Sequence, residues 1–269
     1  MFKRFRGAAT AKDMLLDRCA PLQRTECLPS AQASGRVLSQ DIPSPVNLPG
    51  FDRAAMDGFA VRSEQTRGAK PNAPVYVDHF LPMRAGMPVP AEFDAVVMSE
   101  DCLLRGATLE ITAQLHAYRN VSRIGEDITS GETVFSEGHT FRPPDVALLS
   151  ALGIGEVWVY ERPKVTVIPT GGELVPIGGR ALRAGEAYEI NGLMACLYAE
   201  KWGALASKTE IVPDDEGLIR EAISSHCSAD LIVIIGGTAV GEKDYVPRVL
   251  EEMGELLVHG VRLQPGKPT

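Results

Sequence analysis

The second half of the chain alternates short apolar runs with stretches of helical period. The runs Val165–Pro169 and Leu231–Ile235 predict strands, because they are rich in valine and isoleucine and too short for a helix. The second run has the composition of a strand that is buried on both faces of a parallel sheet. We expect helices at 191–202, 216–225 and 245–253, and another strand near 206–212. This β-α-β-α-β order predicts a doubly wound parallel sheet, which binds ligands at the carboxyl ends of its strands.

The first 160 residues show a different pattern. The segment 37–49 contains Pro43, Pro45 and Pro49, which predicts an extended path over the surface. Between 62 and 140, short runs of period-two alternation separated by turn residues predict a β-rich domain. Helices are predicted at 11–19 and 143–153. A domain boundary is expected close to 161–163.

Acidic residues follow each predicted strand of the second half. Glu173 follows the first strand, Asp214 the next and Asp244 the third. Because the carboxyl ends of parallel strands share one edge of a sheet, we expect these carboxylates to line one crevice. Three carboxylates could hold a hydrated Mg²⁺ ion, which in turn could hold phosphates. The alternative is that they are unrelated surface charges.

Glycines and hydroxyl residues accompany these carboxylates. They are Thr170 and Gly171 after the first strand, and Gly236, Gly237, Thr238 and Gly241 after the third. Small residues at a strand end allow a ligand to approach the backbone amides closely. A glycine pair in this position often does no more than reverse the chain, so the pattern alone leaves both interpretations open.

The composition of the chain argues against some classes of binding partner. The 269-residue chain has a formal net charge of -8, which argues against nucleic acid as a bulk partner, because phosphates would be repelled. Its apolar runs are shorter than the roughly 20 residues that a membrane helix needs, and its first residues lack the apolar core of a signal peptide. The short runs predict no membrane association, and five scattered cysteines without a CxxC pair favour a reducing cytoplasm and give no metal-site spacing.

Seven motifs occur along the chain in a characteristic order. They are NLPGFDRAAMDGFAV (47–61), AGMPVP (85–90), IGEDI (124–128), PTGGEL (169–174), VPDD (212–215), GGTAVGEKDY (236–245) and QPGKPT (264–269). In this combination they resemble the molybdopterin molybdenumtransferase family, the molybdenum insertases, which includes the E domain of gephyrin. The resemblance covers nearly the whole chain.

The resemblance implies an α/β multidomain fold. It places a split N-terminal domain at 1–45 with 141–162, a β-rich domain at 46–140, and a doubly wound α/β molybdopterin-binding domain at 163–269. Because the sequence ends within the last motif, we expect the α/β domain to be truncated and the family's C-terminal β-barrel to be absent.

The resemblance also implies an activity and partners. Family members bind adenylylated molybdopterin, hydrolyse it and insert molybdate into the dithiolene with a divalent cation, usually Mg²⁺. They form homodimers, in which we expect Asp57 to complete the site of the neighbouring chain. Further expected partners are the molybdopterin adenylyltransferase and the apoproteins of molybdenum enzymes. Whether the metal is molybdenum or tungsten is left open by the motifs.

Matching each motif residue by residue implies the site. The functional residues would be Asp57 of the FDxxAMDG loop, Asp127 of GED, Glu173 of TGxEL, Asp214 of VPDD, Asp244 of GGxxxGxxDY and Lys267 of PGKP. We expect catalysis by Asp57, Glu173, Asp214 and Asp244, with Glu173 and Asp244 as metal ligands. Lys267, Asp127 and the glycine turns would bind the cofactor.

Some positions depart from the family pattern. They are Arg53, Ala54, Ala85, Gly172, Ile235, Ala239 and Gln264, where members usually carry Asn, Ser, Thr, Asp, Ser or Thr, Ser, and Lys or Arg, respectively. Lost hydroxyls and a lost cation would weaken anion binding. A second hypothesis is therefore a divergent paralogue that binds molybdopterin or acts as a scaffold without turnover. A third, a molybdopterin adenylyltransferase, is disfavoured by the FDxxAMDG loop and the β-rich domain.

Overall fold

A computed structural model describes residues 6–178, 180–236 and 245–262 of the chain. Two compact units are present, and each is described by itself: residues 1–26 with 160–269 form unit 1, and residues 27–159 form unit 2. Within the ranges described, every helix is too short or too polar to cross a membrane.

Unit 1 is built on a parallel sheet of three strands. β14 (Lys164–Pro169) lies in the middle, between β17 (Leu205–Lys208) and β18 (Leu231–Ile235). The chain therefore moves outward from β14 to β17 and then returns to the other side of β14 for β18. This reversal of strand order is what makes a sheet doubly wound, so the prediction is confirmed.

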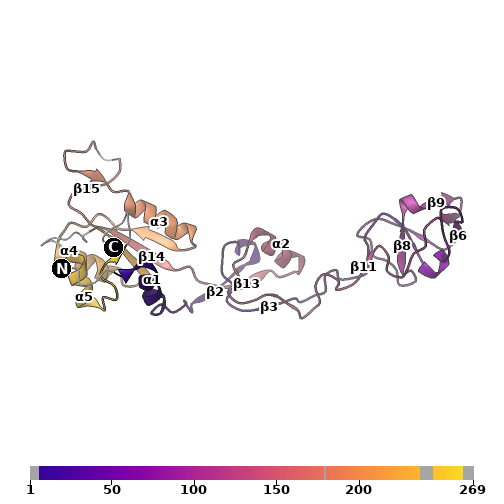
Figure 1. Cartoon of the computed structure of the whole chain (residues 1–269), viewed down its shortest axis with the longest axis horizontal. Coiled ribbons are helices and arrows are strands. Elements are labelled where there is room, and N and C mark those ends of the chain that lie inside the picture. The colour runs from indigo at the N-terminus through magenta and orange to yellow at the C-terminus, as the bar shows by residue number, and fades with distance from the viewer. Residues whose placement is uncertain (1–5, 179, 237–244, 263–269) are drawn as a thin grey trace. The chain divides into compact units, whose positions relative to one another are not determined.

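Helices cover both faces of this sheet (Figure 1). α3 (Asn191–Lys201) packs against Val165 and Val167 of β14, whereas α4 (Glu216–Ser225) and α5 (Tyr245–Met253) pack against Ile168. The two groups of residues point to opposite faces, because side chains alternate along a strand. Each face of β14 thus has its own hydrophobic cluster.

The burial expected for Leu231–Ile235 is wrong in the part of the sheet that the structure describes. Leu231 is exposed and the rest of β18 is half-buried, because β18 pairs with β14 on one side only. It is β14 that occupies the centre and is buried from Val165 to Pro169. β18 is richer in valine and isoleucine than β14, so the composition of the strands does not reveal which of them lies in the middle.

Short elements complete unit 1. The first helix, α1 (Ala8–Leu16), begins and ends three residues before the predicted 11–19, because its first turn is made of alanine-rich sequence without apolar period. The remaining strands form two parallel pairs: β1 (Arg6–Gly7) with β19 (Val261–Arg262), and β15 (Leu174–Val175) with β16 (Ala187–Tyr188).

Unit 2 is mainly β-structure, as predicted. Two antiparallel three-stranded sheets hold its first part. They are β5 (Gly58–Val61) between β7 (Leu81–Met83) and β8 (Ala95–Met98), and β10 (Thr108–Ile111) between β6 (Val75–Val77) and β9 (Cys102–Arg105). A third pair joins β4 (Arg53–Ala54) to β11 (Val121–Ser122). Short 3₁₀ helices occupy Ser63–Thr66 and Ser99–Asp101.

A second cluster of unit 2 surrounds the predicted helix near residue 143. This helix, α2 (Pro143–Ala151), buries Leu149 against Leu38 and Phe141. The strands beside it are β2 (Thr25–Pro29) with β13 (Glu156–Tyr160), and β3 (Ile42–Pro43) with β12 (Thr133–Phe135). A 3₁₀ helix spans Ser30–Gln32.

Candidate functional site

The strand order of unit 1 reverses between β14 and β18, and their carboxyl ends are joined tightly there. Thr170 is buried, and both its backbone N–H and its hydroxyl donate hydrogen bonds to the carbonyl oxygen of Ile235, at 2.7 and 3.3 Å. Gly236 follows with a φ of +101°, and a Cβ placed on it would lie 2.2 Å from the carbonyl oxygen of Thr170. Only glycine fits this contact.

Of the predicted acidic residues, Glu173 lies on the turn that begins at this edge, and Asp214 contacts that turn from the segment after β17. The N–H of Gly172 donates to Oδ2 of Asp214 at 3.1 Å, and the N–H of Gly171 donates to the carbonyl oxygen of Val212 at 3.1 Å. A Cβ on Gly171 would lie 2.8 Å from Oε2 of Glu173, so the missing side chain leaves room for this carboxylate beside the strand end. Glu173 and Asp214 are both exposed to solvent.

The glycines at 171 and 172 therefore have a local explanation. Gly171 makes space for the carboxylate of Glu173, and Gly172 brings its amide within reach of Asp214. Thr170 and Gly171, expected to bind the cofactor, use their backbone amides to join the neighbouring chain segments. Their contact with a ligand stays a prediction.

Several predicted site residues fall on 237–244 and 263–269 and so lie outside the described residues. They are Gly237, Thr238, Gly241, Asp244 and Lys267, together with the departures Ala239 and Gln264. Gly236 is the last described residue before the first of these ranges, and it lies directly on Thr170.

The three motifs of unit 2 meet one another in that unit. Oδ1 of Asp57 accepts the N–H of Ala85 at 2.8 Å, which fixes the 84–87 turn. Oδ1 of Asp52 accepts the N–H of Ile124 at 2.7 Å and so joins the first motif to the third. Beside this hydrogen bond, β4 and β11 pair as antiparallel strands and hold the first motif against the segment that leads into the third. Residues 51–57, 85–88 and 124–127 thus form one surface of unit 2.

Asp127 and Arg53 form an exposed ion pair on this surface. Nη2 of Arg53 lies 3.8 Å from Oδ2 of Asp127. The sequence marked Arg53 as a departure and Asp127 as a site residue, without any sign that they are partners. Such exposed pairs contribute about 0–1 kcal/mol to stability, so the contact matters for the charge of the surface rather than for folding.

The donor set of unit 1 is compatible with magnesium. Mg²⁺ prefers carboxylate oxygens, keeps several water ligands and is usually held by one or two carboxylates together with substrate phosphates. Glu173 and Asp214 supply two carboxylates close to the same glycine turn. Asp244, the other predicted ligand, is outside the described ranges, and within those ranges no three His, Cys, Asp or Glu residues gather as a metal site.

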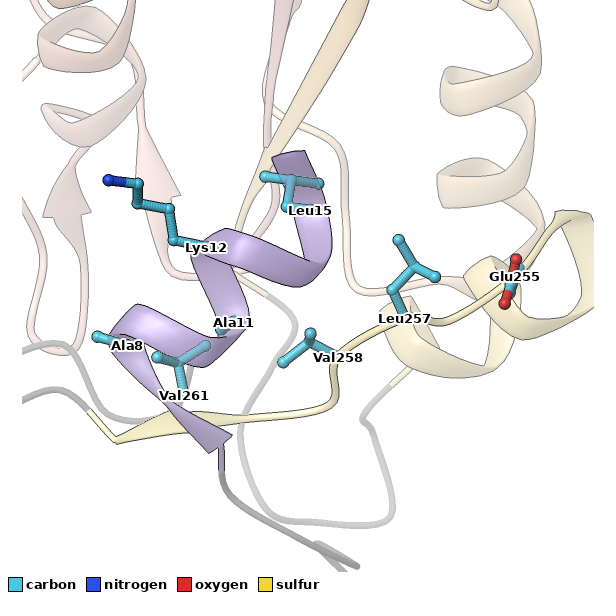
Figure 2. Close-up of a pocket in the computed structure, with 8 residues that line it drawn as sticks. All are labelled: Ala8, Ala11, Lys12, Leu15, Glu255, Leu257, Val258 and Val261. Atoms are coloured by element: carbon cyan, nitrogen blue, oxygen red, sulfur yellow. The ribbon is translucent and has the colours of Figure 1, made fainter. Parts of the chain in front are cut away.

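A separate apolar pocket lies elsewhere in unit 1, between α1 and the segment that follows α5 (Figure 2). Its volume is about 460 Å³, and Ala11, Leu15, Leu257 and Val258 are among its lining residues. Lys12 and Glu255 are the charged residues of its lining. No predicted site residue that the structure describes is among its lining residues.

The fold and the strand-end residues of unit 1 define an α/β ligand-binding domain with its site at a topological switch point. Comparison with known families agrees. Residues 7–153 match the "MoeA N-terminal region (domain I and II)", and residues 166–269 match the "Probable molybdopterin binding domain". The chain belongs to the molybdopterin molybdenumtransferase family, whose members are transferases of molybdenum cofactor biosynthesis.

Individual relatives support this membership. The chain is 33% identical to a molybdopterin molybdenumtransferase of Haemophilus influenzae, over 96% of this chain and 67% of that protein. It is also 33% identical to a putative molybdopterin biosynthesis protein of Methanocaldococcus jannaschii, over 88% and 64%. The solved structure of a molybdopterin biosynthesis protein from Pyrococcus horikoshii aligns with a TM-score of 0.85 at 30% identity, over 98% and 71%. The chain thus spans about two thirds of the length of these relatives.

Proposed function

We propose that this chain inserts molybdate into adenylylated molybdopterin and releases AMP in a Mg²⁺-dependent reaction. One observation carries the proposal: at the switch point of a domain that matches a molybdopterin-binding family, Glu173 lies on a glycine turn whose Gly172 amide binds the carboxylate of Asp214. A substrate with a phosphoanhydride needs a site where its phosphates can lie close to backbone amides and where carboxylates can hold a cation.

The chemistry divides into two steps. Water attacks the phosphoanhydride and the bond to the AMP phosphate breaks, so that AMP is released and molybdopterin stays bound for the second step. The two dithiolene sulfurs then bind molybdenum, and a displaced molybdate oxygen leaves as water with the two thiol protons. No electron transfer is required, because molybdenum keeps its oxidation state.

Residues of unit 1 have defined roles in this proposal. Glu173 and Asp214 would hold Mg²⁺, which supplies positive charge to the phosphate oxygens when bound. Asp214 is oriented by the N–H of Gly172, and Gly236 allows the ends of β14 and β18 to approach closely at this edge. Asp244 is proposed as a further ligand.

The proposal includes a homodimer in the cytoplasm. Asp57 would then complete the site of the partner copy, as the resemblance implies, and Asp127 would help to bind the cofactor. The scattered cysteines, which have no paired spacing, favour a reducing compartment. The molybdopterin adenylyltransferase would supply the substrate, and apoproteins of molybdenum enzymes would receive the product.

A pair of variants tests the role of Glu173. Glu173→Gln removes one negative charge at the strand end and should lower Mg²⁺-dependent AMP release by about a hundredfold, while raising the Mg²⁺ concentration for half-maximal rate. Glu221→Gln removes the same charge from an exposed position of α4 and should leave both values unchanged.

The result also separates the proposed enzyme from the scaffold hypothesis. Equal rates and equal Mg²⁺ dependence for Glu173→Gln and the unmodified chain would refute the role of this carboxylate. Tight binding of adenylylated molybdopterin without AMP release by the unmodified chain would instead support a binding module.

A further inference from the structure

One buried carboxylate of unit 1 has no role in the proposed reaction as described so far. Glu189, which directly follows β16, is 2% exposed. A charged side chain is almost never buried to this extent unless it is paired. The carboxylate of Glu189 accepts the N–H of Gly192 in the first turn of α3, and it binds Nζ of Lys208 at 2.7 Å. Glu189 therefore joins the end of β16 to both α3 and β17.

The ion pair between Glu189 and Lys208 is maintained at neutral pH. Burial acts to raise the pKa of Glu189, but the hydrogen bonds from Lys208 and from the amides of Gly192 and Leu193 outweigh it, so the pKa lies below its usual value. Glu189 is consequently ionised at neutral pH. Its partner Lys208 is the last residue of β17 and lies opposite Val167 of the central strand β14. The carboxylate is thus attached to the parallel sheet itself.

The approach of α3 to this ion pair depends on Gly192. A Cβ on Gly192 would lie 2.8 Å from Cδ of Lys208 and 3.0 Å from each carboxylate oxygen of Glu189. A larger residue would push the helix away from the ion pair, because the space is already filled. Gly192 must therefore face Glu189, which sets the rotation of α3 and leaves Leu193 and Leu197 exposed.

The backbone of Glu189 leads in the other direction, toward the strand-end site. The N–H of Glu189 donates to the carbonyl oxygen of Val175 at 3.0 Å. The N–H of Ala187 donates to the carbonyl oxygen of Glu173, also at 3.0 Å. Between these two hydrogen bonds, β15 and β16 pair as parallel strands. One short strand pair therefore connects the buried ion pair to Glu173, the proposed magnesium ligand.

The strand pair of β15 and β16 needs an anchor of this kind. Each strand has two residues, and an isolated pair of strands is at best marginally stable in water. Arg180 and Glu186 form an ion pair at 2.6 Å, and the hydroxyl of Tyr188 donates to the carbonyl oxygen of Arg180 at 2.7 Å. These contacts lie within the segment 180–188, whereas the ion pair between Glu189 and Lys208 joins this segment to the sheet.

We propose that Glu189 is a positioning residue for Glu173. Its ion pair with Lys208 fixes β16 to the sheet, and the paired backbone of β15 then holds the Glu173 carboxylate at the strand end. Groups that orient a metal ligand matter nearly as much as the ligand, and their loss typically weakens metal binding about 10–100-fold. The inference rests on the proposed role of Glu173 as a magnesium ligand and adds the residues that keep it in place.

The test removes the ion pair without leaving an unpaired buried charge. The double variant Glu189→Gln/Lys208→Met deletes both charges, while the side-chain oxygen of the introduced glutamine can still accept the N–H of Gly192. Lys208→Arg is the conservative variant, because it keeps the opposite charges together. Ile219→Val is the control for a general loss of stability. Ile219 is fully buried in the cluster of α4 and α5, on the other face of the sheet from α3.

Two measurements are made on each protein. The first is binding of Mg²⁺ alone, followed by isothermal titration calorimetry, and the second is hydrogen exchange of the Ala187 amide, which donates to Glu173. The double variant should bind Mg²⁺ about tenfold or more weakly and should exchange the Ala187 amide about tenfold or more rapidly. Lys208→Arg and Ile219→Val should match the unmodified chain in both measurements. A purely structural role for the ion pair would lower the melting temperature of the double variant and leave Mg²⁺ binding unchanged.

Several results would overturn the inference. One is unchanged Mg²⁺ binding in the double variant together with weakened binding in Glu173→Gln. Others are unchanged exchange of the Ala187 amide in the double variant, or equal changes in Ile219→Val. The proposed function is tested separately, because Mg²⁺ binding by Glu173→Gln that equals that of the unmodified chain would refute the metal role of Glu173. The exchange of the Ala187 amide would then still decide whether Glu189 holds Glu173 in position.

Discussion

The contact between Gly236 and Thr170 gives a prediction that can be worked out from the structure. Gly236→Ala adds a Cβ that would lie 2.2 Å from the carbonyl oxygen and 2.8 Å from the hydroxyl oxygen of Thr170. The φ of +101° is also unfavourable for alanine. The strained φ costs about 1–2 kcal/mol, and relief of the overlap by backbone movement costs about 1–3 kcal/mol more.

Gly203→Ala separates these two contributions. Gly203 has nearly the same φ, +96°, but no atom lies within 4 Å of the position of its Cβ. This control should lose only the contribution from φ, about 1 kcal/mol after the gain from a stiffer unfolded chain. Gly236→Ala should lose about 2 kcal/mol more than the control, because only Gly236 has the overlap with Thr170.

Differential scanning calorimetry of both variants measures this difference. For a unit of this size, 1 kcal/mol shifts Tm by roughly 2–4 °C, so Gly236→Ala should melt about 4–8 °C below Gly203→Ala. The transition to compare is that of unit 1, since the two units can unfold separately. Equal melting temperatures for the two variants would refute the close approach of β14 and β18 at their carboxyl ends.

Two further predictions concern unit 2. Hydrogen bonds from Arg142 hold the pKa of Asp145 well below its usual range, so this carboxylate stabilises the fold above about pH 4 and the contribution is lost as pH falls further. Asp145→Asn should therefore lower the free energy of unfolding in urea at neutral pH, and this free energy should change less than in the unmodified chain as pH falls below about 4. Unchanged stability of the variant at neutral pH would contradict this. Asp57→Ala should speed hydrogen exchange of the Ala85 amide about tenfold or more, whereas Asp57→Asn keeps an acceptor oxygen and should preserve protection. Equal exchange in both variants would show that Asp57 does not hold the turn.

Elements with strong local signals were predictable from the sequence. The helices at 216–225 and 245–253 and the strand at 231–235 have the predicted bounds. For α4 the reason is visible, since Asp215 caps it by accepting the N–H of Leu218 at 3.0 Å. The strand predicted at 206–212 is shorter, Leu205–Lys208; beyond it, the N–H of Thr209 still donates to Val167, and Val212 forms an isolated bridge with Thr170.

Features that depend on distant residues were not predictable in the same way. The pairing of β15 with β16 joins segments of two residues each, too short to show a period. The period of α3 predicted a helix but not that Leu193 and Leu197 face solvent, which follows from the ion pair between Glu189 and Lys208. A partner 19 residues away leaves no local pattern.

The candidate site shows the same difference between features with a local sequence signal and features that depend on distant residues. The doubly wound strand order was enough to predict that Glu173 and Asp214 would lie at one edge, where Asp214 accepts a hydrogen bond from the glycine turn that holds Glu173. The approach of Gly236 to Thr170 depends on the register of two strands 65 residues apart, which the sequence does not specify locally. Arg53 was noted only as a departure, because its partner Asp127 comes from another segment.

The central claim is that the strand-end site of unit 1 acts on adenylylated molybdopterin. The most direct measurement is AMP release from this substrate by the unmodified chain, with Mg²⁺ present or chelated and with or without molybdate. We predict release that requires Mg²⁺ and is accelerated by molybdate. Binding of the substrate with no AMP release above the uncatalysed rate, whether or not Mg²⁺ and molybdate are present, would contradict the account.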